Sequence, residues 1–119
     1  MMTSVEAMIE QYVAAWNEKT LQGYRVAFAT CWAADATYTD PNYALVTGVD
    51  GLAALAHSSL EKMPSRTFSI LNAPDYHHNV GRYTWQVALP EETRQGFDYF
   101  EFDEAHQLTR LVSFFGPLK

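Results

Sequence analysis

The chain has 119 residues, of which 48% are hydrophobic and 14% aromatic, enough for one domain with one core over residues 1–119. Its net charge is −6 and its arginines are scattered, so we expect no nucleic-acid partner, which would need clustered positive charge. Residues 1–10 hold no apolar run, and no stretch is apolar enough to span a bilayer, so neither a signal peptide nor a membrane partner is expected.

The first half of the chain has helical periodicity and begins with two predicted helices. The first starts at Thr3, which has the spacing of a capping box with Glu6, and its apolar stripe runs to Trp16. The second starts near Thr20 or Leu21, and its apolar residues recur at intervals of three and four as far as Trp32. Together they supply two amphipathic surfaces for a core.

A short strand and a third helix follow. The strand covers residues 36–39 and is closed by Asp40 and Pro41, because proline keeps the preceding residue out of the helical region. A loop is expected over residues 42–48. The third helix runs over residues 49–62, with Thr47 and Asp50 as a possible cap pair, and Pro64 ends it.

Alternating polar and apolar residues predict a meander of four strands after residue 66. The expected strands cover 66–76 (interrupted at Pro74), 80–89, 95–103 and 107–115. In the third of them, Asp98, Phe100 and Phe102 share one face. Amphipathic helices before such a sheet must cover one of its faces, so the predicted fold class is α+β.

The lone cysteine, Cys31, has apolar neighbours and cannot form an internal disulfide, which predicts a buried thiol in a cytoplasmic protein. A reactive nucleophile is the alternative, but no positive charge lies nearby in sequence to lower its pKa. The four histidines have no metal-ligand spacing, so no metal is expected. His77 and His78 fall in a predicted turn. In another register, either one would enter a pocket as an acid or base, as in a dehydratase.

Four segments carry a family resemblance. They are QYVAAWN at 11–17, DATYTDP at 35–41 with Gly48 after it, GFDYFEF at 96–102, and residues 108–116. Over nearly the whole chain, these segments resemble the ketosteroid isomerase and SnoaL-like branch of the nuclear transport factor 2-like superfamily. The resemblance implies a cone-shaped fold, in which three N-terminal helices pack on a curved, mainly antiparallel sheet that encloses an apolar pocket.

The resemblance also implies roles for three residues. The general base of the isomerases falls on Asp40, and the two groups that stabilise the enolate oxygen fall on Tyr12 and Asp98. The residues alone leave alternatives open. Asp40 before a proline is suited to capping its own turn, and Tyr12 is suited to the core. Asp98 among aromatic side chains must be paired, solvated or protonated, and a salt bridge to an arginine of a neighbouring strand would also satisfy it.

With these roles, the resemblance implies a cofactor-independent enzyme that shifts a double bond in an apolar ketone through an enolate. The aromatic residues expected to bind the substrate are Trp16, Phe28, Trp85, Phe100 and Phe115. A SnoaL-like polyketide cyclase remains an alternative. A limonene epoxide hydrolase is disfavoured, because the last strand offers no second carboxylate for its Asp–Arg–Asp network.

A non-catalytic module that binds a small apolar molecule, or only dimerises, is the third possibility, because fold does not fix function in this group. The outer sheet face, with Tyr99, Val112 and Phe114, is apolar enough for a homodimer under any of these functions.

Overall fold

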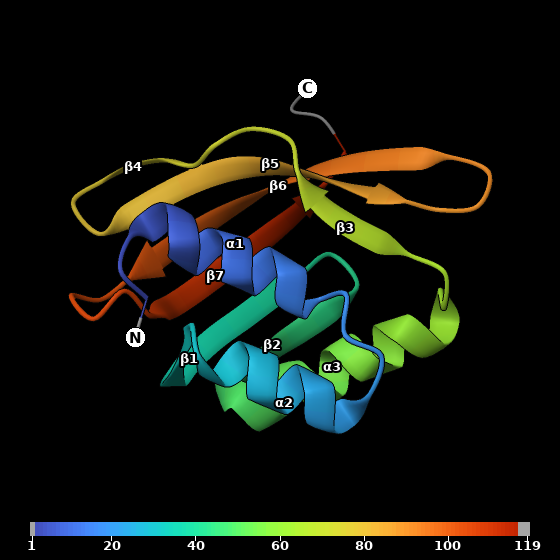
Figure 1. Cartoon of the computed structure of the whole chain (residues 1–119), viewed down its shortest axis with the longest axis horizontal. Helices are drawn as coiled ribbons and strands as arrows, with labels where there is room; N and C mark the ends of the chain where they lie inside the picture. Colours follow the sequence, from blue (N-terminus) through green and yellow to red (C-terminus); the bar gives the residue numbers. More distant parts are fainter. Residues whose placement is uncertain (1, 117–119) are drawn as a thin grey trace.

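The computed structural model describes residues 2–116, which form three helices and seven strands. Their order is α1 (Val5–Ala15), α2 (Leu21–Ala29), β1 (Trp32–Asp40), β2 (Tyr43–Thr47), α3 (Gly48–Lys62), β3 (Thr67–Ile70), β4 (Asp75–His77), β5 (Val80–Ala88), β6 (Thr93–Phe102) and β7 (Leu108–Phe115). Figure 1 shows α1 lying across the strands, with α2 and α3 beside β1 and β2.

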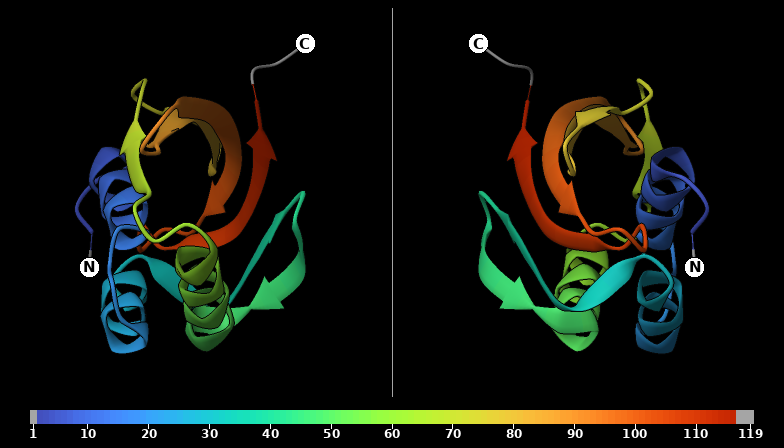
Figure 2. Two further views of the ribbon diagram at one scale, coloured as in Figure 1. Left: turned by 90° about the vertical axis from the view of Figure 1, so that its right-hand side faces the viewer. Right: turned by 90° about the vertical axis from the view of Figure 1, so that its left-hand side faces the viewer.

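All seven strands belong to one sheet with the order β2-β1-β7-β6-β5-β3, and β4 also pairs with β5. The neighbours are antiparallel except for β1 and β7, which are parallel. Figure 2 shows β5, β6 and β7 curving strongly around the interior, with α1 at their side and α2 and α3 below. The predicted α+β class, with helices packed on a curved and mainly antiparallel sheet, is confirmed.

The helix starts differ from prediction at the first helix and agree at the second. Helix α1 is capped by Ser4, whose Oγ accepts a hydrogen bond from the backbone N–H of Ala7 at 3.0 Å, so the predicted capping box at Thr3 is wrong. Helix α2 is capped by Thr20 as expected. It ends nine residues later, because Trp32 already belongs to β1.

The predicted loop after Asp40 is also wrong, since most of it forms β2 and makes a hairpin with β1. The two strands are joined by a tight turn in which the carboxylate of Asp40 accepts backbone N–H groups. Thr47 stands at the N-cap of α3, but its side chain makes no capping hydrogen bond. The interrupted strand before Pro74 divides into β3 and β4, both of which pair with β5.

The two faces of the sheet have the predicted alternation along β6. The inner face, defined by Tyr83, Asp98 and Ser113, is buried against the helices, and the outer face carries Phe97 and Tyr99. The strand register places Tyr83 opposite Asp98, and Asp98 opposite Ser113. Three polar residues from three strands therefore form one row across the inner face.

Candidate functional site

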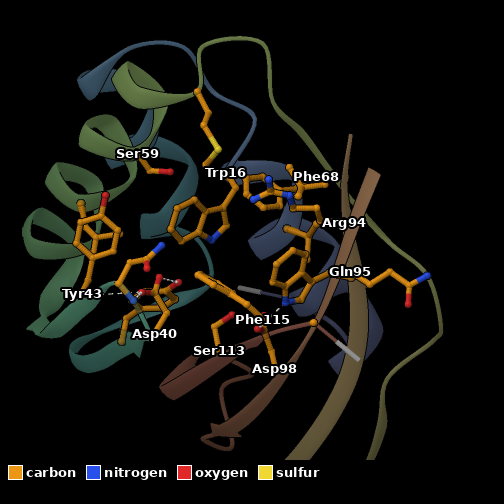
Figure 3. Close-up of a pocket in the computed structure, with 18 of the residues that line it drawn as sticks. Trp16, Asp40, Tyr43, Ser59, Phe68, Arg94, Gln95, Asp98, Ser113 and Phe115 are labelled. Carbon is orange, nitrogen blue, oxygen red and sulfur yellow. Dashed lines mark hydrogen bonds between the residues drawn. The ribbon is translucent and has the colours of Figure 1, made fainter. Parts of the chain in front are cut away.

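A cavity of about 840 Å³ lies between the inner face of the sheet and the helices. Its walls are mainly aromatic and aliphatic, and its polar groups fall at the sheet, the β1–β2 turn and the end of α3. Figure 3 shows Asp40, Ser113 and Asp98 along one side of the cavity and Ser59 on the other, with Trp16 between them. A mostly apolar cavity with a few polar groups is the usual form of a small-molecule site.

Asp98 lies in the middle of β6 and points into this cavity from the sheet. It is 4% exposed and accepts hydrogen bonds from the hydroxyl of Tyr83 and from Nε1 of Trp85, the latter at 2.9 Å. Burial raises its pKa from 3.8 to about 6, although the hydrogen bonds from Ser113, Tyr83 and Trp85 oppose the rise. The carboxyl can therefore change protonation state near neutral pH.

The indole of Trp85 reaches Asp98 because the residue opposite it on β6 is glycine. Trp85 pairs with Gly96, and a Cβ at that glycine would lie 2.1 Å from the indole ring. The next strand places Phe115 opposite Gly96, and its ring meets Trp85 edge to face, with 6.0 Å between the ring centroids. A larger residue at position 96 would therefore displace Trp85, one of the donors that hold Asp98.

The salt-bridge alternative for Asp98 is not observed. The two arginines on neighbouring strands pair with other carboxylates, Arg82 with Asp75 at 3.2 Å and Arg110 with Glu101 at 3.6 Å. Within residues 2–116, no arginine or lysine forms a salt bridge with Asp98. Its hydrogen-bond donors are neutral side chains, so no fixed positive charge holds Asp98 in its ionised form and a ligand can change its protonation state.

Tyr12 reaches the same cavity from the middle of α1. It is 2% exposed, and its ring stacks on Trp32 with a centroid separation of 5.8 Å. Burial and the nearby charge of Asp98 raise the pKa of its hydroxyl well above 10, so the phenol stays protonated. It forms no hydrogen bond with either carboxylate of the cavity within residues 2–116, and it is available as a donor to a ligand.

Asp40 also lines the cavity, at the end of β1. Its Oδ1 accepts the backbone N–H groups of Asn42 and Tyr43 at 2.8 and 2.9 Å, and its Oδ2 accepts the hydroxyl of Tyr38 at 2.6 Å. The turn-capping interpretation of Asp40 is thus correct, and it coexists with a place in the cavity. A carboxylate has about four acceptor positions, so one remains for a substrate.

The five aromatic residues expected to bind substrate divide into two groups. Trp16, Trp85 and Phe115 line the cavity. Phe28 and Phe100 do not, and both are fully buried in the core. Phe28, on α2, packs on Tyr12 and Trp16, which line the cavity in front of it. Phe100, on β6, covers Gly81. A side chain on the buried face of a helix or strand thus need not reach the cavity. For these two, the expected contact with substrate is not supported by their placement.

Sequence reasoning missed the partners of both carboxylates. Tyr38 lies two residues before Asp40 and so shares its face of β1, a spacing that is readable in the sequence. Tyr83 lies 15 residues before Asp98, and only the pairing of β5 with β6 brings them together. Burial raises the pKa of each of these phenols well above 10, so both remain donors.

The histidines and the cysteine lie away from the cavity. None of the four histidines is among its lining residues, and His77 and His78 contact each other in an exposed turn, with 2.9 Å between their Nδ1 atoms. Cys31 is fully buried, and burial raises its pKa to about 12.

In residues 2–116, no three His, Cys, Asp or Glu side chains are grouped so that they would hold a metal ion. No helix of the described part is long and apolar enough to cross a membrane.

The architecture is similar to that of several solved structures. A "putative isomerase of the SnoaL-like family" from Agrobacterium tumefaciens is 27% identical, with a TM-score of 0.86 over 98% of this chain and 100% of that one. A "putative ketosteroid isomerase" from Kribbella flavida is 14% identical, with a TM-score of 0.72 over 97% of this chain and 79% of that one. A "putative SnoaL-like polyketide cyclase" from Jannaschia sp. is 11% identical, with a TM-score of 0.73 over 97% of this chain and 90% of that one.

At identities this low, the second and third structures establish a common fold and nothing more. Among curated proteins, no sequence matches. The model of the SnoaL-like domain, in contrast, matches residues 9–113, which include Tyr12, Asp40 and Asp98. The chain therefore belongs to the SnoaL-like domain family, within the nuclear transport factor 2-like fold.

Proposed function

We propose that the protein is a cofactor-independent enzyme that moves a proton between carbons of an apolar ketone through an enolate. The observation that carries the proposal is that Tyr12, Asp40 and Asp98 all line one cavity with aromatic walls. Two carboxyl groups and a protonated phenol in such a cavity are the groups that enolisation requires: a base for the C–H and donors for the oxygen.

In the proposed reaction, the carboxylate of Asp40 takes a proton from the carbon next to the carbonyl group. The electron pair of that C–H bond forms the C=C bond of the enolate, and the carbonyl oxygen gains the negative charge. Asp40 then returns the proton to a carbon further along the conjugated chain. The double bond has moved, no electrons have left the substrate, and no cofactor is needed.

Tyr12 and Asp98 would stabilise the enolate oxygen. Tyr12 donates its phenolic hydrogen, and Asp98 donates only when it is protonated. Burial raises the pKa of Asp98 to about 6, so the carboxyl group can take up a proton close to neutral pH. A negative oxygen beside it disfavours the ionised carboxylate, so enolate formation and proton uptake by Asp98 support each other.

A SnoaL-like cyclase is the second candidate, and one of the similar structures carries that description. The same proton abstraction would start the reaction, but the carbanion would attack a second carbonyl group of the substrate. The cavity of about 840 Å³ has room for a substrate of several rings. The two candidates differ in whether the product has a new ring or a moved double bond.

The first test separates binding from chemistry. 2-Naphthol, whose anion resembles a flat enolate, should bind, and its affinity should fall at least tenfold in Tyr12→Phe and Asp98→Ala, each of which removes one donor. The protein should also catalyse exchange of the α-protons of β-tetralone in deuterated water, followed by proton NMR. Binding without exchange would make the protein a non-catalytic module, and binding that ignores both substitutions would contradict the proposed site.

We also propose that the protein forms a homodimer through the outer face of the sheet. This dimer would be compatible with either reaction and with a non-catalytic function. Phe97 and Phe114 stack there with 5.0 Å between ring centroids, and Phe114 is 44% exposed. Analytical ultracentrifugation should show a dimer that Phe114→Glu converts to a monomer. Val26→Glu, at an exposed apolar residue of α2, is the control and should leave the dimer intact. A monomeric parent protein would contradict this arrangement.

A further inference from the structure

A buried positive charge lies directly behind the cavity wall. Arg66 is fully buried, and its guanidinium donates to the backbone oxygens of Trp16 and Ala56, to the hydroxyl of Tyr24 and to the hydroxyl of Ser59. These acceptors are all neutral, and no carboxylate within residues 2–116 forms a salt bridge with Arg66. An arginine remains charged when buried, so the fold keeps a cation there without a counter-charge.

Arg66 contacts the cavity wall through two aromatic rings and through Ser59. Its guanidinium lies 5.2 Å from the ring centroid of Phe68 and 5.9 Å from that of Trp16, and both residues also line the cavity. Ser59, on α3, lines the cavity as well and is only 9% exposed. The guanidinium is thus separated from a ligand by one layer of side chains.

Ser59 is oriented so that it can donate to a ligand. Its Oγ accepts a hydrogen bond from Nε of Arg66 at 3.3 Å, which leaves the hydrogen of the hydroxyl free. Within residues 2–116, this hydroxyl donates to no other protein group. Figure 3 shows it projecting from α3 toward Trp16, across the cavity from Asp98. A donor polarised by a buried cation is suited to a negatively charged oxygen.

A second cation stands at the rim on the same helix. Lys62 follows Ser59 by three residues, so both lie on one face of α3, and both line the cavity. Its Nζ lies 3.4 Å from the hydroxyl of Tyr43 and 5.2 Å from the centroid of that ring, and it pairs with no carboxylate in the described part of the chain. Arg94, also at the rim, is already paired with Glu92 at 2.6 Å.

From this arrangement we infer that the substrate carries a carboxylate, which binds at Ser59 and Lys62 while the reacting ketone lies at Tyr12 and Asp98. This inference rests on the proposed function for the position of the ketone. The cavity then presents two kinds of polar group: two carboxyl groups and a phenol from the sheet and α1, and a hydroxyl backed by Arg66 and an ammonium group without a carboxylate partner from α3. An apolar keto acid would place its carboxylate at the groups of α3 and its ketone at Tyr12 and Asp98.

The test uses two ligands without a phenol, so that it does not depend on the enolate site. 2-Naphthylacetate and the neutral 2-naphthylacetamide have nearly the same shape and differ in charge. In isothermal titration calorimetry, the carboxylate should bind more tightly than the amide. Ser59→Ala should reduce that preference roughly tenfold, since it removes a charge-assisted hydrogen bond, and Lys62→Gln should reduce it roughly threefold, as expected for an exposed ion pair.

Arg94→Gln is the matched control, because it removes a rim cation that Glu92 already neutralises, and the preference should not change. If Ser59→Ala fails to fold, Lys62→Gln gives an independent reading. Equal binding of the two ligands, no binding of the carboxylate, or a preference that neither substitution affects would overturn the inference. Carboxylate preference in a protein that binds no naphthol would support this site and contradict the enolate site, so the two failures are distinguishable.

Discussion

The two carboxyl groups of the cavity are held by different kinds of structure. Asp98 lies in the middle of β6 and is held by side chains of the neighbouring strand, whereas Asp40 lies at the end of β1 and is held mainly by the backbone of its own turn. The position of Asp98 depends on the register of the sheet, and that of Asp40 depends on the turn over residues 40–43. Identical functional groups thus acquire different properties: Asp98 has a raised pKa, and Asp40 has a fixed orientation.

The largest effect is expected on catalysis when Asp40 loses its ability to accept a proton. Asp40→Asn should slow α-proton exchange in β-tetralone about 10²–10⁴-fold, the usual contribution of a positioned general base. The fold should be kept, because the amide oxygen can still accept the two backbone N–H groups of the turn. Proton NMR measures the exchange, and circular dichroism checks the fold. Unchanged exchange would mean that Asp40 serves only the turn.

The second prediction concerns the cost of burying Asp98. Its pKa is raised from 3.8 to about 6, so the native state binds a proton that the unfolded state has released in this range, and stability falls as pH rises through it. Relative to Asp98→Asn, the parent protein should lose about 2 kcal/mol between pH 4 and pH 7. Urea unfolding at both pH values measures this difference. A pH-independent difference would show that Asp98 does not titrate in this range.

A smaller effect is expected from the donor that the sheet register supplies. Tyr83→Phe removes a hydrogen bond that favours the ionised form of Asp98, so the pKa of Asp98 should rise further, by about one unit. Carbon-13 NMR titration of the carboxyl group measures it. Tyr99→Phe is the matched control on the outer face, where that hydroxyl bonds to Glu101, and it should leave Asp98 unaffected.

The smallest effect separates the structural role of Asp40 from its chemistry. Asp40→Ala removes the acceptor for two backbone N–H groups and should lower the free energy of unfolding at pH 7 by about 1 kcal/mol. Asp40→Asn should lose less, since it keeps that acceptor. Urea unfolding of both variants gives the values. Equal stability of Asp40→Ala and the parent protein would show that the turn forms without its cap.

Much of the fold was predictable because it depends on local patterns. The alternation along β6 placed Asp98 on the apolar face, and Thr20 marked the start of α2, as observed. Strand β2 was missed because it is short and three of its five residues are exposed, so it lacks the alternation of a half-buried strand. Phe28 and Phe100 lie outside the cavity, contrary to expectation, because a sequence shows which face of a helix or strand is buried but not where a cavity ends.

Local periodicity in the sequence is enough to place most of the helices and strands in order, and four short segments carry the family resemblance, which in turn implies the roles of Tyr12, Asp40 and Asp98. Which groups share the cavity, and what each of them contacts, depends on the folded arrangement of the whole chain. Tyr83 meets Asp98 through strand register, and Arg66 meets Trp16 across 50 residues of sequence through the packing of helices. Such contacts depend on sheet curvature and helix placement, which no local pattern encodes.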